Sequence, residues 1–150
     1  MKKFLSIILS LFCTYLAAQA TKFGKVTLDE LKAEHCEKFP EAKAEILACS
    51  NEMHYEIIGG SIYLMEKKYF KVKVYDKSTD WVNQEIVAYK NSSEKEEITG
   101  FKANSYNLEN GKIVKNEVQR KETFKEDATR DYTQYNFTFP NIKEGSIIEW

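Results

Sequence analysis

The sequence predicts a mainly β protein, an antiparallel β-sandwich-like domain with one short helix near its N-terminus. Aromatic residues make up 13% of the 150 residues, and such side chains favour half-buried, pleated surfaces. Several segments alternate apolar and polar residues, which is typical of antiparallel strands with one buried face. Two pairs of segments are separated by Gly59-Gly60 and Asn110-Gly111, which suit two-residue hairpin turns.

The overall composition is that of an ordinary globular domain. Hydrophobic residues amount to 43% and charged residues to 30%, so neither global disorder nor a polytopic membrane protein is expected. The formal net charge of −1 provides no electrostatic argument for a nucleic-acid partner.

The first twenty residues have the pattern of a secretory signal peptide. Two lysines, Lys2 and Lys3, precede an apolar run from Phe4 to Ala18, and Ala18-Gln19-Ala20 has the small–x–small pattern of a cleavage site. We therefore expect a signal peptide over 1–20 and an exported β-rich domain over 21–150, periplasmic or extracellular. The alternative is a membrane anchor, but at about 1.5 Å per residue the run spans about 22 Å of a layer about 30 Å thick. No membrane span is expected after cleavage.

Two cysteines, Cys36 and Cys49, remain in the mature chain. An oxidising compartment allows a disulfide between them. Two unpaired, small apolar residues are the alternative, since the separation of the Cα atoms cannot be read from sequence.

A capping box predicts one short helix. Thr27 can accept a hydrogen bond from the amide of Glu30, whose side chain can reach back to the amide of Thr27. The helix is expected from Leu28 to Glu34, and Pro40 ends any continuation. The following segment, Glu41 to Cys49, combines high helix propensity with alternation, and we favour a strand.

The central part of the chain is predicted to form strands. Tyr55 to Ile58 and Ile62 to Met65 flank the Gly59-Gly60 turn. The next strand, Tyr69 to Tyr75, should point one set of apolar side chains into the core and leave a solvated face opposite. The predicted core residues are Phe70, Val72 and Val74, and the solvated face would hold Tyr69, Lys71, Lys73 and Tyr75.

The remaining elements are predicted in the same way. Strands are expected over 81–89, 98–108 and 113–118, with Asn110-Gly111 joining the last two as a type I′ hairpin. Charged loops are expected over 91–97 and 122–130, the second containing at most a single turn.

The C-terminal part ends inside a predicted strand. One strand alternates over Tyr132 to Phe139 and ends at Pro140, which cannot donate to a ladder, and another begins at Ser146. Because the sequence stops at Trp150 in mid-strand, we expect a domain truncated at its C-terminal end. A true C-terminus paired into a sheet is the alternative.

No constellation of residues predicts catalysis or metal binding. His35, Cys36, Cys49 and His54 fit no zinc-ligand spacing. Cys36, His54 and Asp76 occur in an order that a thiol protease could use, but no tight-turn sequence surrounds Cys36 to hold a reactive thiolate. We therefore predict no catalytic residue, no metal and no cofactor, and this chain is not expected to be an enzyme.

A set of aromatic residues is the one candidate binding face, because exposed rings could form a stacking platform for a glycan or a peptide. These residues are Tyr69, Tyr75, Trp81 and Tyr132.

Four stretches, in this order, carry a family resemblance: Phe23–Thr27 leading to Glu30-Leu31, Phe70–Tyr75, Lys102–Asn107 followed by Gly111–Val114, and Phe139–Trp150. They resemble the N-terminal domain of unknown function 3857 of secreted bacterial transglutaminase-like proteins. The most specific part is the final Phe-Pro-Asn…Gly-Ser-Ile-Ile-Glu motif. The resemblance implies a β-sandwich-like domain that precedes a papain-like transglutaminase core, whose Cys–His–Asp triad matches no position here.

Three functions are compatible with these observations. The first is a non-catalytic accessory domain that supports a downstream transglutaminase-like core of the same polypeptide. The second is a stand-alone secreted module that binds a glycan or a peptide. The third is an enzyme in its own right that uses Cys36 and His54.

Overall fold

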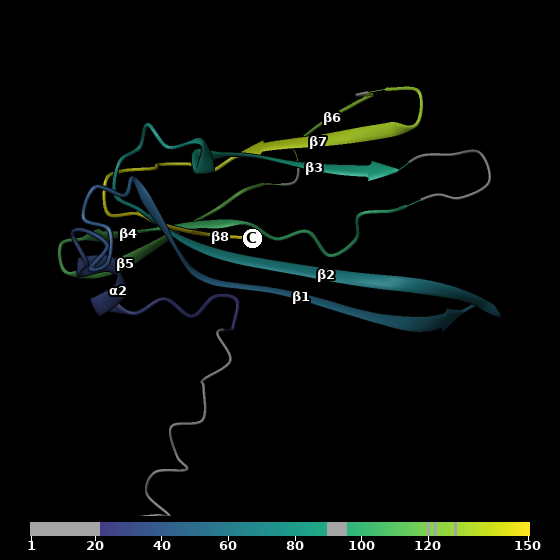
Figure 1. The fold of residues 1–150 in the computed structure, drawn as a ribbon, viewed down its shortest axis with the longest axis horizontal. Coiled ribbons are helices and arrows are strands. Elements are labelled where there is room, and N and C mark those ends of the chain that lie inside the picture. Colours follow the sequence, from purple (N-terminus) through teal and green to yellow (C-terminus); the bar gives the residue numbers. More distant parts are fainter. Residues whose placement is uncertain (1–21, 90–95, 120, 122, 128) are drawn as a thin grey trace, which may run out of the picture.

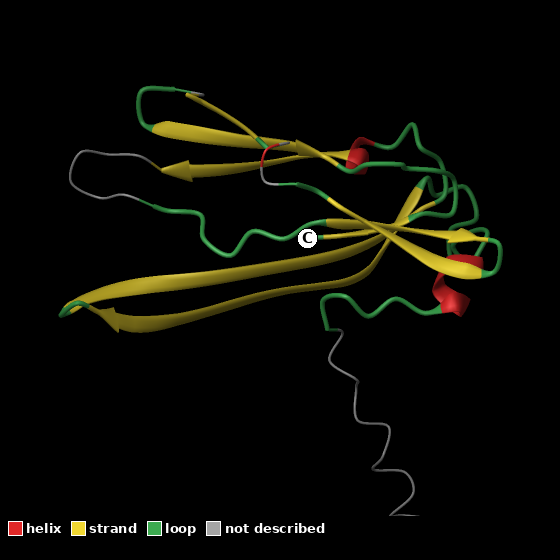
Figure 2. Ribbon diagram, turned by 180° about the vertical axis from the view of Figure 1, so that it is seen from behind, coloured by secondary structure: helices red, strands yellow, loops and turns green. Residues whose placement is uncertain are grey.

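The computed structural model describes residues 22–89, 96–119, 121, 123–127 and 129–150. The predicted signal peptide and most of the predicted charged loop at 91–97 lie outside these residues. The described chain forms a mainly β fold with antiparallel sheets and one short α-helix, as predicted (Figures 1 and 2). The elements are α2 (Leu28–Lys32), β1 (Ala44–Ile58), β2 (Ser61–Val74), the 3-10 helix η1 (Asp80–Val82), β3 (Asn83–Tyr89), β4 (Asn104–Glu109), β5 (Lys112–Glu117), β6 (Phe124–Asp127), β7 (Tyr132–Thr138) and β8 (Ile147–Glu149).

The strands make two sheets. The first has five strands in the order β1-β2-β8-β4-β5, and the second has three in the order β3-β7-β6. Figure 1 shows the second sheet lying above the first, with β1 and β2 extending together as a long arm below β3 and β7. The strand β8 comes last in the sequence but lies in the middle of the first sheet, between β2 and β4.

The predicted capping box and helix start are confirmed. The side chain of Glu30 accepts from the amide of Thr27 at 2.7 Å, and the hydroxyl of Thr27 accepts from the amide of Glu30 at 3.2 Å. The helix ends at Lys32 rather than Glu34, and it buries Leu31. Among the residues described here, no helix is long and apolar enough to cross a membrane.

Both predicted two-residue turns are confirmed. Gly59 and Gly60 have φ angles of 60° and 85°, and Asn110 and Gly111 have 50° and 75°. Positive φ at both central residues is what a type I′ turn needs, and it matches the twist of the flanking strands. The first turn joins β1 to β2, which is continuous where the sequence suggested two separate strands.

Other predicted elements differ from the structure in type or in where they begin. Residues 124–127 form β6, not a loop or a single turn, because their backbone pairs with β7 at the edge of the sheet, where the side chains of Lys125 and Glu126 are exposed. The strand predicted over 98–108 begins only at Asn104. Trp81 lies in η1, and the strand predicted to start there begins at Asn83.

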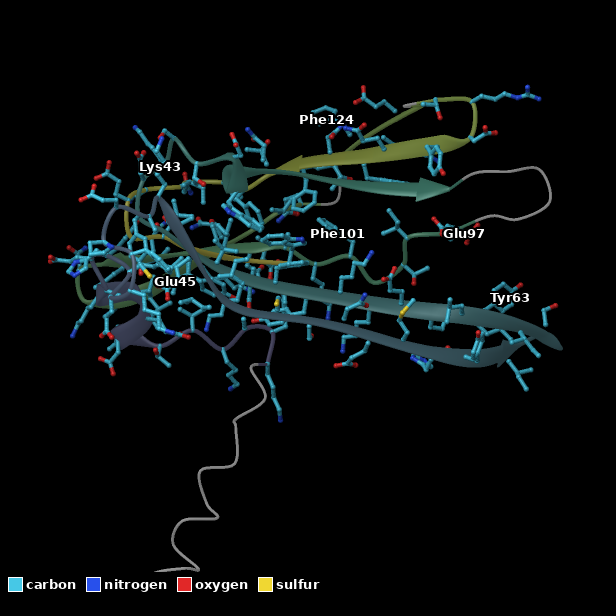
Figure 3. All side chains as sticks on the ribbon, in the orientation of Figure 1. Lys43, Glu45, Tyr63, Glu97, Phe101 and Phe124 are labelled. Carbon is cyan, nitrogen blue, oxygen red and sulfur yellow. The ribbon has the colours of Figure 1, made fainter. Side chains whose placement is uncertain are left out.

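The main core lies between the two sheets. Val72 and Val74 are fully buried there, as predicted, and they pack with Ile148, Phe137 and other apolar residues of the same cluster. Phe70 is half-buried and stacks on Trp150, with ring centroids 5.0 Å apart. The remaining members of the core are Ala44, Trp81, Ala103, Val118, Phe139 and Ile142, together with Phe101, which is labelled in Figure 3.

The opposite face of the first sheet is covered, which corrects the prediction of a solvated surface. Tyr69, Lys71 and Lys73 are all buried. The N-terminal segment, residues 22–36, lies over them, and Leu31 packs there with Tyr106 and Ile147. Alternation in a strand shows which residues share a face, but a distant segment decides whether that face meets water.

Candidate functional site

The residues considered for thiol catalysis do not form a site. Cys36 is buried near Tyr75, whose pKa is raised mainly by burial and by Glu45, with a smaller contribution from Cys36. His54 is exposed and pairs with Met65, nine residues from Val74 at the end of β2, which is about 30 Å in an extended strand. Asp76 accepts a hydrogen bond from the amide of Ser78 at 2.8 Å. Within the described residues, no group of three or more His, Cys, Asp or Glu could hold a metal ion.

The disulfide considered from the sequence is not formed. Cys36 and Cys49 are both free, the first buried and the second exposed. Cys49 lies on β1 opposite Phe70, whereas Cys36 lies in the segment that follows α2. The alternative from sequence, two unpaired cysteines, is what the structure contains.

The four aromatic residues of the predicted binding face do not form one exposed surface. Tyr69 is buried, and its hydroxyl donates to Glu149 at 3.2 Å. Tyr75 is half-buried, and its hydroxyl donates to Glu45 at 2.7 Å. Trp81 packs in the main core, and Tyr132 on β7 is exposed. A stacking platform made of these four residues is therefore absent.

Sequence reasoning missed a buried polar network around Glu149. Glu149 lies in the middle of a row across three strands, with Lys71 of β2 on one side and Asn104 of β4 on the other. Its carboxylate is fully buried and accepts from the amide of Gly24 at 2.8 Å and from the hydroxyls of Tyr69 and Tyr106. Burial and the neighbouring Glu149 carboxylate raise the pKa of both phenols. Glu149 thus binds the N-terminal segment to the sheet.

Two buried lysines extend this network under α2. Lys71 donates to the carboxylate of Glu30 at 2.5 Å and to the carbonyl of Lys25 at 2.9 Å. Lys73 donates to the carbonyls of Leu31 and Gly145, both at 2.7 Å. Burial lowers the pKa of the Lys73 ammonium to about 8, although Glu30 opposes this shift.

The network is closed, because its donors and acceptors already satisfy one another. Among the described residues, every buried side-chain nitrogen and oxygen has a hydrogen-bond partner. A general acid or base needs access to a substrate. The lysines and Glu149 instead hold residues 22–36 against the sheet, so we interpret the network as structural.

The open surface of the molecule is on the long hairpin. We call Asn51–Ile58 of β1 and Ser61–Lys68 of β2 the outer half, and Ala44–Ser50 with Tyr69–Val74 the inner half. Every described residue of the outer half is exposed except Met65, which is half-buried. Figure 3 labels Tyr63 near the tip, where side chains extend from both strands well away from α2.

One face of the outer half is apolar. The register pairs Ile57 with Ile62 and Tyr55 with Leu64, so these side chains are neighbours across the two strands. Tyr55, Ile57 and Ile62 are 75%, 74% and 71% exposed. We define the apolar face as Met53, Tyr55, Ile57, Ile62 and Leu64.

The apolar face lies on the same side of the hairpin as the core and is separated from it along β2 by Glu66 and Lys68. In a strand, alternate residues share a face, so Ile62 and Leu64 lie on the same face of β2 as Phe70, Val72 and Val74. The second sheet and the aromatic cluster cover that face in the inner half but not in the outer half. Adjacent polar groups are paired with each other: Glu66 accepts from Asn51 at 2.8 Å and contacts Lys68 at 3.0 Å.

An apolar face of this kind is a candidate interaction surface. Soluble proteins rarely expose contiguous patches of large apolar side chains, and those patches often mark sites of protein contact. The Gly59-Gly60 turn predicted that the segments on either side of it are strands. The sequence did not indicate which part of the hairpin would be left uncovered.

In comparisons with known proteins, the chain matches no protein-family model, no curated protein and no solved structure. The resemblance found in the sequence motifs stays a prediction.

Proposed function

We propose that this chain is a non-catalytic, exported accessory domain that precedes and supports a transglutaminase-like core, and that the apolar face of the hairpin is its contact with that core. The single observation that carries the proposal is the uncovered face, made of Met53, Tyr55, Ile57, Ile62 and Leu64. The signal-like first twenty residues support export, and the sequence motifs support the family of the core.

Covering the apolar face would provide a substantial driving force. Full burial of one large aliphatic or aromatic side chain contributes about 1.5–3 kcal/mol relative to exposure. Several such side chains lie side by side here, whereas a typical interface depends on a few central anchors. Tyr55 and Ile57 are the most exposed members of the face, so a partner would gain most from covering them.

The geometry supports a positioning role rather than a chemical one. Cys36 and His54 lie far apart, and Lys71, Lys73 and Glu149 are occupied in holding the N-terminal segment. The stand-alone glycan or peptide module has less support, because among its proposed platform residues only Tyr132 is exposed.

The test is binding between the chain and a separately produced transglutaminase-like domain encoded in the same reading frame. We expect binding by the chain as it stands, and a loss of at least about tenfold for the double variant Tyr55→Ser/Ile57→Ser. The matched control is Tyr63→Ser/Ile58→Ser, which removes one tyrosine and one isoleucine from the opposite face of the same hairpin. Equal loss in both variants, or no binding at all, would contradict the proposal.

A second measurement addresses the enzyme alternative. If the purified chain shows hydrolytic or acyl-transfer activity, the double variant Cys36→Ser/His54→Ala should leave it unchanged, because these residues do not share a site. Loss of activity in that variant would instead indicate a thiol–imidazole mechanism.

A further inference from the structure

The strand β1 forms one edge of the first sheet. The order β1-β2-β8-β4-β5 places β2 on one side of β1 and, among the residues that the structure describes, no strand on the other. The open side of β1 is separated from β8, and so from Trp150, by the whole width of β2. It runs along the full strand, beside the inner half as well as the outer half of the hairpin.

The backbone groups on the open side of β1 can be assigned from the pairing of β2. Phe70 directs its N–H and carbonyl groups to Trp150 of β8. Successive residues of a strand direct these groups to opposite sides, so the odd-numbered residues of β2 face β1. Their partners over 50–58 of β1 are even-numbered. The odd-numbered residues over 49–57 therefore direct their N–H and carbonyl groups to the open side.

The regular part of β1 is symmetric about one residue. A β-bulge interrupts the pairing with β2 between Ile46 and Ala48, and the Gly59-Gly60 turn follows Ile58. A bulge bends its strand and disrupts the ladder. Between the bulge and the turn, Ala48–Ile58 pairs without interruption, and Met53 is its midpoint. Two antiparallel copies of this stretch can pair along its full length only with Met53 opposite Met53.

We propose that the open edge of β1 binds the same edge of a second copy of this chain, antiparallel and with Met53 on the two-fold axis. An unpaired strand edge is a ready template for another strand. The first sheet would then continue through both copies, with five strands from each. A two-fold interface uses the same patch on both copies, so each contact occurs twice. The inference goes beyond the proposed function, because it uses the edge of β1 and not a contact with a core domain.

The charges along β1 are complementary in this register. Glu52 of each copy lies opposite His54 of the other, on the face of the hairpin that does not hold the apolar face. An imidazole N–H can donate to a carboxylate, and cross-strand pairs of this kind stabilise neighbouring strands. The two residues direct their own backbone groups to β2, so they form a non-hydrogen-bonded pair with each other, in which side chains approach most closely.

The neighbouring registers lack this complementarity. An axis at Glu52 sets two carboxylates against each other, and an axis at His54 sets Glu52 against Glu56. Like charges directly opposite each other are destabilising. An axis at Asn51 or Tyr55 shifts part of the regular stretch past the bulge or the turn. The register with Met53 on the axis is therefore favoured by both charge and length.

The test is self-association of the purified chain, measured by sedimentation equilibrium. We expect an equilibrium between monomer and dimer. Glu52→Lys sets an ammonium group against His54, and His54→Glu sets two carboxylates against each other, so each should weaken the dimer at least about tenfold. The double variant Glu52→Lys/His54→Glu exchanges the two charges and should restore the affinity to within about threefold of the parent chain. An axis at Tyr55 predicts no restoration, because the new carboxylate would face Glu56.

A matched pair of methionine variants separates the open edge from the rest of the hairpin. Met53→Lys places two ammonium groups together on the axis and should also weaken the dimer at least about tenfold. Met65→Lys makes the same change on β2, one strand away from the open edge, and should weaken it by less than about threefold. Circular dichroism checks that both variants keep the fold of the parent chain.

Amide hydrogen exchange measured by NMR locates the contact. As the protein concentration rises, exchange should slow at Met53 and Tyr55, whose amides point to the open side. Exchange should stay unchanged at His54 and Glu56, whose amides point to β2 in the monomer as well.

A chain that stays monomeric up to about 1 mM would overturn the proposal. So would a dimer that survives Met53→Lys, or a double variant that dimerises no better than its two single variants. Protection of the Met53 and Tyr55 amides that does not depend on concentration would also overturn it, because another segment of the same chain would then occupy the edge.

Discussion

The inner and outer halves of the β1–β2 hairpin are made by the same two strands, yet they differ in burial. Along β2, the inner half is covered on both faces, by the second sheet on one and by residues 22–36 on the other. The outer half is exposed on both faces. Lys71 and Lys73 are buried in the first, whereas Ile62 and Leu64 are exposed in the second. Residue polarity alone therefore does not predict burial in this hairpin.

The comparison also shows how the two halves are stabilised. In the inner half, buried lysines are tolerated because each meets carbonyl or carboxylate acceptors. In the outer half, among the residues that the structure describes, each strand pairs only with the other, and an isolated two-stranded hairpin is marginally stable in water. A partner that covers the outer half would bury its side chains, as the side chains of the inner half are already buried.

The largest expected effect comes from comparing one substitution, isoleucine to alanine, at a buried position and at an exposed position. Ile148→Ala removes a fully buried side chain from the main core and should lower the free energy of unfolding by about 2–5 kcal/mol. Ile62→Ala, at a side chain that is 71% exposed, should change it by about 0.5 kcal/mol or less. Urea unfolding followed by circular dichroism measures both. Similar losses at the two sites would show that the outer half is already covered in solution.

A smaller effect is expected from two lysines of β2. Lys71→Met leaves the Glu30 carboxylate and the Lys25 carbonyl without their donor, and should cost about 1–3 kcal/mol. Lys67→Met, in the exposed outer half, should fall within about 0.5 kcal/mol of the parent. The same denaturation assay applies. An unchanged stability for Lys71→Met would mean that the network contributes nothing to holding residues 22–36.

The lowered pKa of Lys73 should make the stability of the folded chain depend on pH. Its pKa is about 8 in the folded chain, below its ordinary value of 10.5, so between these values the unfolded chain binds more protons than the folded one. Stability should therefore rise as pH increases from about 8 towards 10. Above about pH 10 the trend should reverse, since the raised pKa values of Tyr69 and Tyr106 keep these phenols protonated in the folded state while they ionise in the unfolded one.

Thermal unfolding in matched buffers from pH 7 to 11 measures this profile. Lys73→Met should abolish the rise and keep the decline. A flat profile for the parent chain between pH 8 and 10 would show that Lys73 is not desolvated in solution.

The smallest effect concerns thiol reactivity rather than stability. Cys49 is exposed and should react with a thiol reagent in the native chain, whereas buried Cys36 should react only after unfolding. Cys49→Ser should remove the native reaction alone. If both thiols of the denatured, unreduced mature chain are unreactive, they are joined in a disulfide, and the structural arrangement of residues 36–49 would need revision.

The helix start and the turns were predictable because they are determined by residues that are close together in the sequence. The capping box depends on Thr27 and Glu30, three residues apart, and the two hairpin turns depend on the tolerance of Gly59-Gly60 and Asn110-Gly111 for positive φ. The strand β6 was missed because its residues 124–127 pair only through β7, and the burial of Lys71 was missed because its acceptors lie more than forty residues away in sequence.

The candidate site likewise depends partly on local sequence and partly on contacts between distant segments. The β class, the short helix, the turns, and the side chains of β2 that share a face were predictable from the residues alone, because these features follow from local propensity and from the period of two in a strand. Contacts between distant segments had to be seen in the fold: residues 22–36 bury the lysine face, and Tyr55, Ile57 and Ile62 stay uncovered. Burial depends on which distant segments pack across a strand, and the sequence of the strand itself does not say which segments those are.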